Sequence, residues 1–517
     1  MTSAVITGAA ASAGSASLDE IHADVIVVGC GPVGLTLAIR LGQMGHRVAV
    51  VERWPEAYPL PRAVHFDHEV GRIFASLGMG DVLRASSEPA EVYEWRNADG
   101  VVLLRFGRIG LGPSGWPESS MFCQPVIEAA LNAQAEATPG VTIHRGLEVE
   151  FVEDDGEQVV ARTADGLAFV GAYAVGCDGA NSTVRGGLGV EEVDLGFFYD
   201  WLIVDLVLDP PRVFDPINVQ ICDPHRPTTM VSGGPGRRRW EFMALPGESR
   251  DDLGALERAW ELLAPWDVHP GNAVIERHAV YTFGARFAQQ WRKGRVMLAG
   301  DAAHLMPPFA GQGMCTGVRD AVNLAWKLSA VLSGYAEEGL LDTYQRERLP
   351  AVRAAIEFSM ALGRVICVAD PVEAAARDAA MAAAVGDGLT EAAEPPPLVE
   401  GIIEPRSPGA GALSVQGTVG GVWLDEVTGS GWRLLCLGAD PQAVEPVVLE
   451  WFAALGGTVH ELTDPGAGLA EWFARHGAHF VVVRPDFIVF GTASTATEAG
   501  ELLTGLRLQL TGAGVVS

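Results

Sequence analysis

The sequence predicts an α/β protein of three parts: a domain built on a parallel sheet, an antiparallel sheet inserted into it, and a small C-terminal α/β domain. Three observations support this prediction. A glycine-rich turn joins a strand to a helix near the start of the chain, β-rich sequence fills residues 193–281, and a Pro-rich segment at 391–401 precedes a new alternation of strands and helices. A chain of 517 residues can form two or three such domains.

The first part opens with a βαβ unit. The run Asp24–Gly29 is continuously apolar and β-branched, which is typical of a buried parallel strand. Pro32–Met44 is predicted to be a helix, and Arg47–Glu52 a second buried strand.

The turn in this unit has the spacing GxGxxG, with glycines at 29, 31 and 34. Glycines allow a tight turn and the close approach of a pyrophosphate to the helix N-terminus. Glu52 ends the second strand, 18 residues after Gly34, where it can accept hydrogen bonds from a ribose. The unit therefore predicts a dinucleotide site. The acid fits NAD or FAD better than NADP, because it would repel a 2′-phosphate.

The rest of the first part, which we assign to residues 23–192, mixes strands and helices. Glu91–Phe106 is predicted to be a hairpin turning at Asn97–Gly100, and we expect residues 88–108 to contribute to the inserted sheet. A helix is expected over Cys123–Ala137. Short strands should follow, and they return to a buried strand at Ala172–Gly176.

Residues 193–281 read as a separate antiparallel sheet, and residues 282–390 as the return to the first domain. In the returning segment a buried strand leads to Gly300 and Asp301, and a long helix is expected over Gln312–Ser333. This pattern suggests an acid that accepts hydrogen bonds from a polyol, and a helix N-terminus aimed at an electron-rich group.

Residues 402–517 are predicted to form a third domain, after a Pro-rich linker at 391–401. Its order of strand, helix, strand, helix, hairpin and helix is thioredoxin-like, but it has no CxxC pair. Cys436, on a predicted buried strand, is expected to serve packing or oligomer contact and not redox chemistry. Arg484–Asp486 is interpreted as the turn of the hairpin.

Composition excludes several classes of function. The formal net charge of −29 makes nucleic acid and membrane partners improbable. The seven cysteines are odd in number and none lie at CxxC spacing, so we expect no disulfide framework and no metal site. A reducing cytoplasm is the simplest compartment. Residues 1–22 are small and polar, and are interpreted as a disordered leader.

A third motif, "CDGANSTVR" at Cys177–Arg185, completes a set that is known from one family. With the GxGxxG turn and the Gly300-Asp301 segment in the same order, the chain resembles the FAD-dependent aromatic hydroxylases, the group A flavoprotein monooxygenases, over about 23–361. "RRWEF" at Arg238–Phe242 and the C-terminal domain resemble the branch that contains 3-(3-hydroxyphenyl)propionate hydroxylase and related phenol hydroxylases.

The resemblance implies a Rossmann-type FAD-binding domain with tightly bound FAD, while NADPH or NADH docks transiently. A small aromatic substrate and O₂ would react through a C4a-hydroperoxyflavin, and a phenolic ring would be hydroxylated ortho or para to its hydroxyl. The alternatives are a polyketide-tailoring flavin hydroxylase, a Baeyer–Villiger monooxygenase and a non-catalytic flavin-binding protein. A homo-oligomer is a further expectation.

The resemblance also implies roles for individual residues. His65 is the first candidate for a base that deprotonates the phenol and Asp67 the second, with a structural histidine as the alternative for His65. His304 is expected to shape its loop. Asp178 and Arg185 are candidates for NAD(P)H docking, with a surface salt bridge as the alternative for Arg185. The residues expected to bind FAD are Gly29, Gly31, Pro32, Gly34, Glu52, Arg53, Arg62, Gln124, Asp178, Gly179, Asp301, Pro308, Gly311, Gln312, Gly313 and Met314. Those expected to line the substrate pocket are Tyr199, Trp201, Gln220, Trp240 and Pro307.

Overall fold

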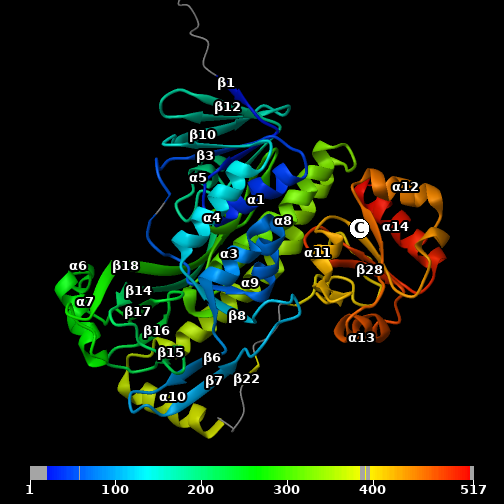
Figure 1. Ribbon diagram of the computed structural model, residues 1–517. Helices are drawn as coiled ribbons and strands as arrows, with labels where there is room; N and C mark the ends of the chain where they lie inside the picture. Colours follow the sequence, from blue (N-terminus) through cyan, green and yellow to red (C-terminus); the bar gives the residue numbers. More distant parts are fainter. Residues whose placement is uncertain (1–19, 58, 385–389, 392–395, 513–517) are drawn as a thin grey trace, which may run out of the picture.

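The computed structural model describes residues 20–57, 59–384, 390–391 and 396–512 (Figure 1). Most of the predicted leader lies outside these residues, but its last three form a short strand. This strand, β1 (Glu20–His22), pairs in parallel with β12 (Ala168–Gly171), so the leader as predicted is too long. Part of the predicted linker, 392–395, also lies outside the described residues.

The core of the first domain is a six-stranded sheet in the order β19-β20-β13-β2-β3-β9. All neighbours pair in parallel except β19, which is antiparallel to β20. The central strands are almost wholly buried, because helices cover the sheet and the βαβ strands carry apolar side chains on both faces. The strands are β2 (Val25–Val28), β3 (Val48–Glu52), β9 (Val141–Arg145), β13 (Tyr173–Gly176), β19 (Arg292–Lys293) and β20 (Val296–Leu298).

Helices and small sheets complete this domain. Helix α8 runs beside α1 and its apolar positions are buried, as the predicted helical period requires. The domain also contains a four-stranded sheet in the order β1-β12-β11-β10 and a three-stranded sheet in the order β4-β8-β5. The helices are α1 (Pro32–Gln43), α2 (His68–Phe74), α3 (Gly80–Ser86), α4 (Gln124–Ala137), α5 (Thr183–Leu188), α8 (Gly313–Leu332) and α9 (Asp342–Ile366). The strands are β4 (His65–Asp67), β5 (Ser87–Pro89), β8 (Ser119–Phe122), β10 (Val149–Asp154) and β11 (Val159–Thr163).

A nine-stranded sheet in the order β21-β18-β14-β17-β16-β15-β6-β7-β22 forms the second layer of the molecule (Figure 1). The hairpin β6–β7 joins it through a parallel pairing of β6 with β15, so residues from the first part of the chain do enter this sheet. One face packs on α6 (Arg250–Leu253) and α7 (Leu256–Leu263), and α10 (Pro371–Ala384) lies against β7. The strands are β6 (Val92–Arg96), β7 (Val102–Gly107), β14 (Glu192–Leu208), β15 (Asn218–Ile221), β16 (Thr228–Ser232), β17 (Arg237–Met243), β18 (Ala273–Ala288), β21 (His304–Leu305) and β22 (Thr390–Glu391).

The C-terminal domain has a four-stranded sheet in the order β26-β25-β27-β28, with one parallel and two antiparallel pairings. This is the mixed sheet of a thioredoxin-like domain. Cys436 is buried at the end of β25 and is a free thiol. The elements are β25 (Arg433–Cys436), α12 (Pro446–Ala454), β26 (Thr458–Glu461), α13 (Ala467–Arg475), β27 (Phe480–Val483), β28 (Val489–Ala493) and α14 (Ala496–Leu510), with α11 (Leu424–Thr428) before them.

The turn between β27 and β28 inserts a buried ion pair into the first domain, so it is more than the hairpin turn that we predicted. Arg484 Nη2 lies 2.7 Å from Glu347 Oε2 of α9, and Asp486 Oδ2 accepts hydrogen bonds from Asn323 and Trp326 of α8. Lys327 of α8 lies 2.9 Å from the same Glu347 oxygen. These contacts lock the domain onto α8 and α9, and their charges are satisfied mutually.

Within the described part of the chain, no helix combines the length and the apolar character needed to cross a bilayer.

Candidate active site

A cavity of about 1420 Å³ lies where the carboxyl ends of the parallel strands face the nine-stranded sheet. Strands β2, β3, β13 and β20 each deliver lining residues at or just beyond their ends: Val28 and Gly29, Glu52, Cys177, and Ala299 and Asp301. In open parallel sheets, ligands bind in the crevice at this edge. The three motifs, far apart in sequence, therefore meet at one site.

The glycine turn is shaped both by packing and by the cavity. Gly29 has φ +107°, and a Cβ atom there would lie 2.4 Å from the carbonyl oxygen of Cys177. A Cβ at Gly34 would lie 2.1 Å from the carbonyl oxygen of Gly29. By contrast, nothing lies within 4 Å of a Cβ built on Gly31, which is the N-cap of α1 and lines the cavity beside Pro32. This leaves room for a phosphate at the helix N-terminus.

Glu52 is fixed beside that turn. Its carboxylate accepts hydrogen bonds from the backbone N–H groups of Cys30, at 2.8 Å, and Trp54, at 3.0 Å. Both oxygens keep acceptor capacity for ribose hydroxyls, since each can accept more than one bond. Arg53 packs its guanidinium over the ring of Trp54, and both residues line the cavity.

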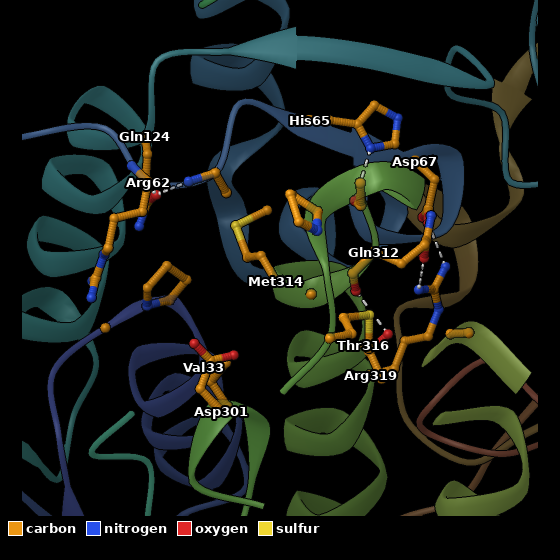
Figure 2. Close-up of a pocket in the computed structure, with 18 of the residues that line it drawn as sticks. Val33, Arg62, His65, Asp67, Gln124, Asp301, Gln312, Met314, Thr316 and Arg319 are labelled. Atoms are coloured by element: carbon orange, nitrogen blue, oxygen red, sulfur yellow. Dashed lines mark hydrogen bonds and ion pairs between the residues drawn. The ribbon is translucent and has the colours of Figure 1, made fainter. Parts of the chain in front are cut away.

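Gln124 holds the segment that carries Arg62 (Figure 2). Its side-chain oxygen accepts from the backbone N–H groups of Arg62, at 2.9 Å, and Ala63, at 2.5 Å, while its NH₂ donates to Glu128. The Arg62 guanidinium lies 3.7 Å from Glu128 and lines the cavity. Gln124 therefore shapes the loop, and it also lines the cavity.

Asp301 opens into the cavity, and no described residue donates a hydrogen bond to its carboxylate. Its side chain is exposed to the cavity, and the surrounding protein raises its pKa by desolvation, an effect that His304 and Arg62 oppose. The turn that presents it is held by Asp320 of α8, which accepts from the Gly300 N–H at 3.2 Å, from His304 at 2.6 Å and from Arg348 at 2.8 Å. An acid without a partner at the end of a rigid turn is what a polyol ligand needs.

The loop before α8 lines the cavity with Pro307, Pro308 and the four residues from Gly311 to Met314. Helix α8 starts at Gly313 with Gln312 as its N-cap, so its first N–H groups lie at this wall. The Gln312 amide is clamped from both ends: it donates to Asp67 at 3.1 Å and accepts from Arg319 at 3.1 Å.

His65 and Asp67, the predicted bases, are both engaged by protein groups (Figure 2). His65 Nδ1 donates to the Gly311 carbonyl at 3.1 Å, while Arg108 donates to Nε2 at 3.3 Å. Burial, reinforced by Arg108, lowers the pKa of His65 to about 4, so the ring is neutral near pH 7. These contacts favour a positioning role for His65, and its role as a base stays a prediction.

Asp67 is the N-cap of α2, where it accepts from the Val70 N–H, and it lies 2.7 Å from Arg319. Burial would raise its pKa, but Arg319 and the hydrogen bonds hold that pKa well below the usual range. Asp67 is therefore a permanently ionised support for Gln312. This geometry does not favour its predicted proton transfer.

The CDGANSTVR motif, Cys177–Arg185, is divided between the cavity and the core. Asp178 lines the cavity with Gly179, but its carboxylate also accepts from Ser182 and from the Val184 N–H at the start of α5. Arg185 is only 8% exposed, lies outside the cavity lining, and donates to the carbonyls of Ala180 and Ala302. The docking role predicted for Arg185 conflicts with this burial.

Of the predicted substrate residues, only Pro307 lines the cavity. Side chains on a strand alternate between faces, so Arg239 and Glu241 of β17 line the cavity while Trp240 packs behind the sheet against Phe214 and Trp266.

Trp201 and Tyr199 of β14 pack against Phe309 and Phe197, respectively, and do not line the cavity. Gln220 is fully buried and accepts from Thr229 Oγ1 at 2.7 Å, so it supports a wall residue without being one. The expectation that these four residues form the pocket wall is therefore not met.

The wall on the side of the nine-stranded sheet consists of residues that we did not predict to line the substrate pocket. They are Tyr93, Phe106, Arg108, Asn218, Thr229, Val231, Arg239, Glu241 and Tyr281. The alternation around Trp240 was the only signal for Arg239 and Glu241, and the position of Arg108 just after β7 gave none.

The described residues contain no group of three or more His, Cys, Asp or Glu side chains placed to hold a metal ion. They do fit FAD: an open glycine at a helix N-terminus, an acid without a partner and a second helix N-terminus line one cavity.

Comparison with known proteins agrees with this geometry. Residues 22–359 match the FAD binding domain family and residues 411–508 the HcaD C-terminal domain family. The chain is 38% identical to a probable NADH-specific resorcinol 4-hydroxylase of Rhodococcus jostii, over 95% of both chains. It is 34% identical to a 3-(3-hydroxy-phenyl)propionate/3-hydroxycinnamic acid hydroxylase of Mycolicibacterium smegmatis, over 93% of this chain and 92% of that one. A solved structure of aklavinone-11 hydroxylase with FAD and aklavinone is 27% identical, with a TM-score of 0.76 over 95% of this chain and 99% of that one.

Proposed function

Because this chain belongs to the FAD-binding family of flavoprotein aromatic hydroxylases, we propose that it hydroxylates a phenol that carries a second polar substituent in the meta position, with NADH as the reductant. Two relatives support this substrate class, since resorcinol and 3-(3-hydroxyphenyl)propionate are both meta-substituted phenols. NADH follows from the name of the first relative.

The observation that carries the proposal is the wall that faces the Pro307–Pro308 loop. It combines aromatic surface from Tyr93 and Phe106 with the polar groups of Arg108 and Glu241. Such a wall suits a flat ring with two polar substituents, because apolar surface holds the ring and a few polar groups orient it.

FAD, when bound, supplies the chemistry by taking a hydride from the nicotinamide and activating O₂. Residues of this chain would hold it: Gly31 and the start of α1 would bind the pyrophosphate, Glu52 the ribose, and Asp301 the ribityl chain. The start of α8 would supply its positive end to negative charge on the ring. The apolar side chains of Met121 and Phe309 exclude water from the same cavity.

The test is a screen of the purified holoenzyme with NADH and with NADPH. Resorcinol, 3-(3-hydroxyphenyl)propionate, phenol and a polycyclic phenol are offered, and cofactor oxidation is followed together with product mass. We expect faster NADH oxidation and a product heavier by one oxygen, placed ortho or para to a hydroxyl, with the meta-substituted phenols. NADH oxidation without any oxygenated product would contradict the proposal. Oxygen insertion only into the polycyclic substrate would instead favour the tailoring alternative.

We also propose a cytoplasmic location and self-association. All seven cysteines are free thiols, which suits a reducing compartment. Light scattering during size-exclusion chromatography measures the subunit number directly, and a monomer at micromolar concentration would contradict self-association.

A further inference from the structure

We propose that the substrate is a dihydric phenol held at both oxygens, with Arg108 binding one oxygen as the phenolate and Glu241 accepting a hydrogen bond from the other hydroxyl. The inference deepens the proposed function and rests on it. It narrows the class from meta-substituted phenols in general to those with two hydroxyls.

Arg108 is a cation without an anion. It follows β7 directly, and its backbone N–H donates to the Glu91 carbonyl at 2.8 Å, which fixes where the side chain starts. Its guanidinium lines the cavity and donates only to the neutral His65 ring, at 3.3 Å, while Nε is buried without any partner. Among the described residues no carboxylate lies within 4.0 Å of it.

A guanidinium in such a place calls for an anionic ligand. Arginine stays protonated at every accessible pH, and leaving its charge unpaired away from water is costly. An oxyanion that receives its N–H groups would satisfy both the charge and the buried donor. Because Arg108 also touches His65, which packs on Gly311, the anion would lie beside the loop that borders the flavin.

Glu241 is the negatively charged group that would accept from the second hydroxyl. It is buried on β17, it lines the cavity, and no described residue donates a hydrogen bond to its oxygens. Arg239 is 3.7 Å away, but that guanidinium is already bound to Asp205 at 2.6 Å and to the Arg62 carbonyl at 2.7 Å. An oxygen of Glu241 is thus available to accept from a hydroxyl, and the acid would disfavour a substrate carboxylate nearby.

Tyr93 lines the cavity together with Arg108 and Glu241. Its strand partner is Phe106, two residues before Arg108, while Glu241 is the strand partner of Thr229. The pKa of the Tyr93 phenol agrees with this placement, since burial and Glu241 raise it and Arg108 lowers it. Tyr93 itself is held by donating to Gln220 at 3.3 Å, and the same Gln220 oxygen accepts from Thr229. The two charged groups thus line one cavity with Tyr93, which is where a ring held at both oxygens would lie.

The chemistry of the ring favours this orientation. On binding, the hydroxyl at Arg108 loses its proton to water, and the phenolate donates electron density to its ortho and para carbons. In a 1,3-dihydric phenol, one carbon is para to one oxygen and ortho to the other, so both substituents activate the same position. Electrophilic oxygen transfer to that carbon needs no additional base from the protein.

The first test measures substrate affinity of the holoenzyme without NADH, from the change in flavin absorbance, between pH 6 and pH 9. For the wild type, resorcinol should bind more tightly as the pH rises towards the pKa of the free phenol. R108M should bind about tenfold to hundredfold more weakly, with little dependence on pH, because a charge-assisted hydrogen bond is lost. R108K should keep the dependence on pH. R353Q, an exposed arginine of α9 paired with Glu357, is the matched control.

Few other groups near Arg108 can produce this dependence. His65 has its pKa lowered to about 4, and Asp67 has its pKa held well below the usual range. Tyr93 titrates far above the range tested, and Glu241 has its pKa raised by burial, so it is varied separately. If R108M purifies without FAD, R108Q takes its place.

The second test separates the role of Arg108 from that of Glu241. Wild type should prefer resorcinol to 3-methoxyphenol, which lacks the second O–H, and E241Q should reduce that preference about tenfold. R108M that binds resorcinol normally but loses 3-(3-hydroxyphenyl)propionate would show that Arg108 serves a carboxylate, and would overturn the inference. Equal preference in wild type and E241Q would overturn the role of Glu241. Either result leaves hydroxylation by the wild type intact, so the proposed function is tested separately.

Discussion

Replacing Asp301 by asparagine should separate cofactor binding from protein stability. In the folded chain its carboxylate receives no hydrogen bond from any described residue, so the substitution removes no internal contact. Desolvation by the surrounding protein raises the pKa of Asp301, which means that the ionised form costs the protein stability as the pH rises above the usual value of 3.8. We therefore expect D301N without FAD to unfold at the same denaturant concentration as the wild type, or slightly higher, at neutral pH.

FAD affinity should respond in the opposite direction. A hydrogen bond to a charged group contributes about 1.5–3 kcal/mol, so D301N should bind FAD roughly tenfold to 150-fold more weakly. Titration of the apoprotein with FAD, followed by quenching of flavin fluorescence, measures this change. Thermal unfolding of the same apoprotein measures stability.

Asp320 gives the matched comparison, because it is buried nearby but satisfied by Gly300, His304 and Arg348. D320N should destabilise the apoprotein itself, by about 3–5 kcal/mol, since it leaves buried partners uncompensated. The reasoning is refuted if D301N binds FAD as tightly as the wild type, or if it destabilises the apoprotein as much as D320N does.

Three further changes test other parts of the structure. Glu347→Gln leaves the buried Lys327 without a carboxylate within 4.0 Å and Arg484 with Asp486 alone, so it should weaken docking of the C-terminal domain by about 3–5 kcal/mol; hydrogen exchange in α8 and α9 measures this, and unchanged exchange would contradict it. Burial lowers the pKa of Lys327 from 10.5 to about 8, so the unfolded chain binds more protons between these values and stability should rise with pH there. Lys327→Met should abolish that rise in urea unfolding, while a persistent rise would assign it to another group. Gly34→Ala should destabilise the apoprotein by about 1–3 kcal/mol through overpacking, whereas Gly31→Ala should leave it intact and lower only FAD content; equal unfolding temperatures would refute this contrast.

The parts of the fold that sequence patterns predict well are those with local causes. The βαβ unit and α8 follow from apolar runs of the right period and from glycines next to them, and their observed bounds, Pro32–Gln43 and Gly313–Leu332, lie within a residue of prediction. The acid Asp301 could be placed at the cavity because a buried strand leads directly to it.

The substrate wall could not be predicted for a physical reason. Strand β17 is buried on both faces, so the alternation of Arg239 and Glu241 with Trp240 and Phe242 does not say which pair of side chains lines the cavity. The burial of Arg484 and Asp486 could not be predicted from the sequence either. Their polar character suggests an exposed turn, and only the fold brings Glu347, a residue 137 positions earlier, to meet them.

The buried turn of the C-terminal domain also limits how this chain can be recombined with its relatives. A chimera that imports only the residues after the linker would combine the buried turn of one protein with the contacting helices of another. Asn323, Trp326 and Glu347, which bind this turn, belong to helices of the first domain. Helix α8, with its 20 residues spanning about 30 Å, begins at the cavity and carries two of these residues, Asn323 and Trp326. Exchanges of sequence that preserve these contacts would therefore transfer α8, α9 and the C-terminal domain as one block.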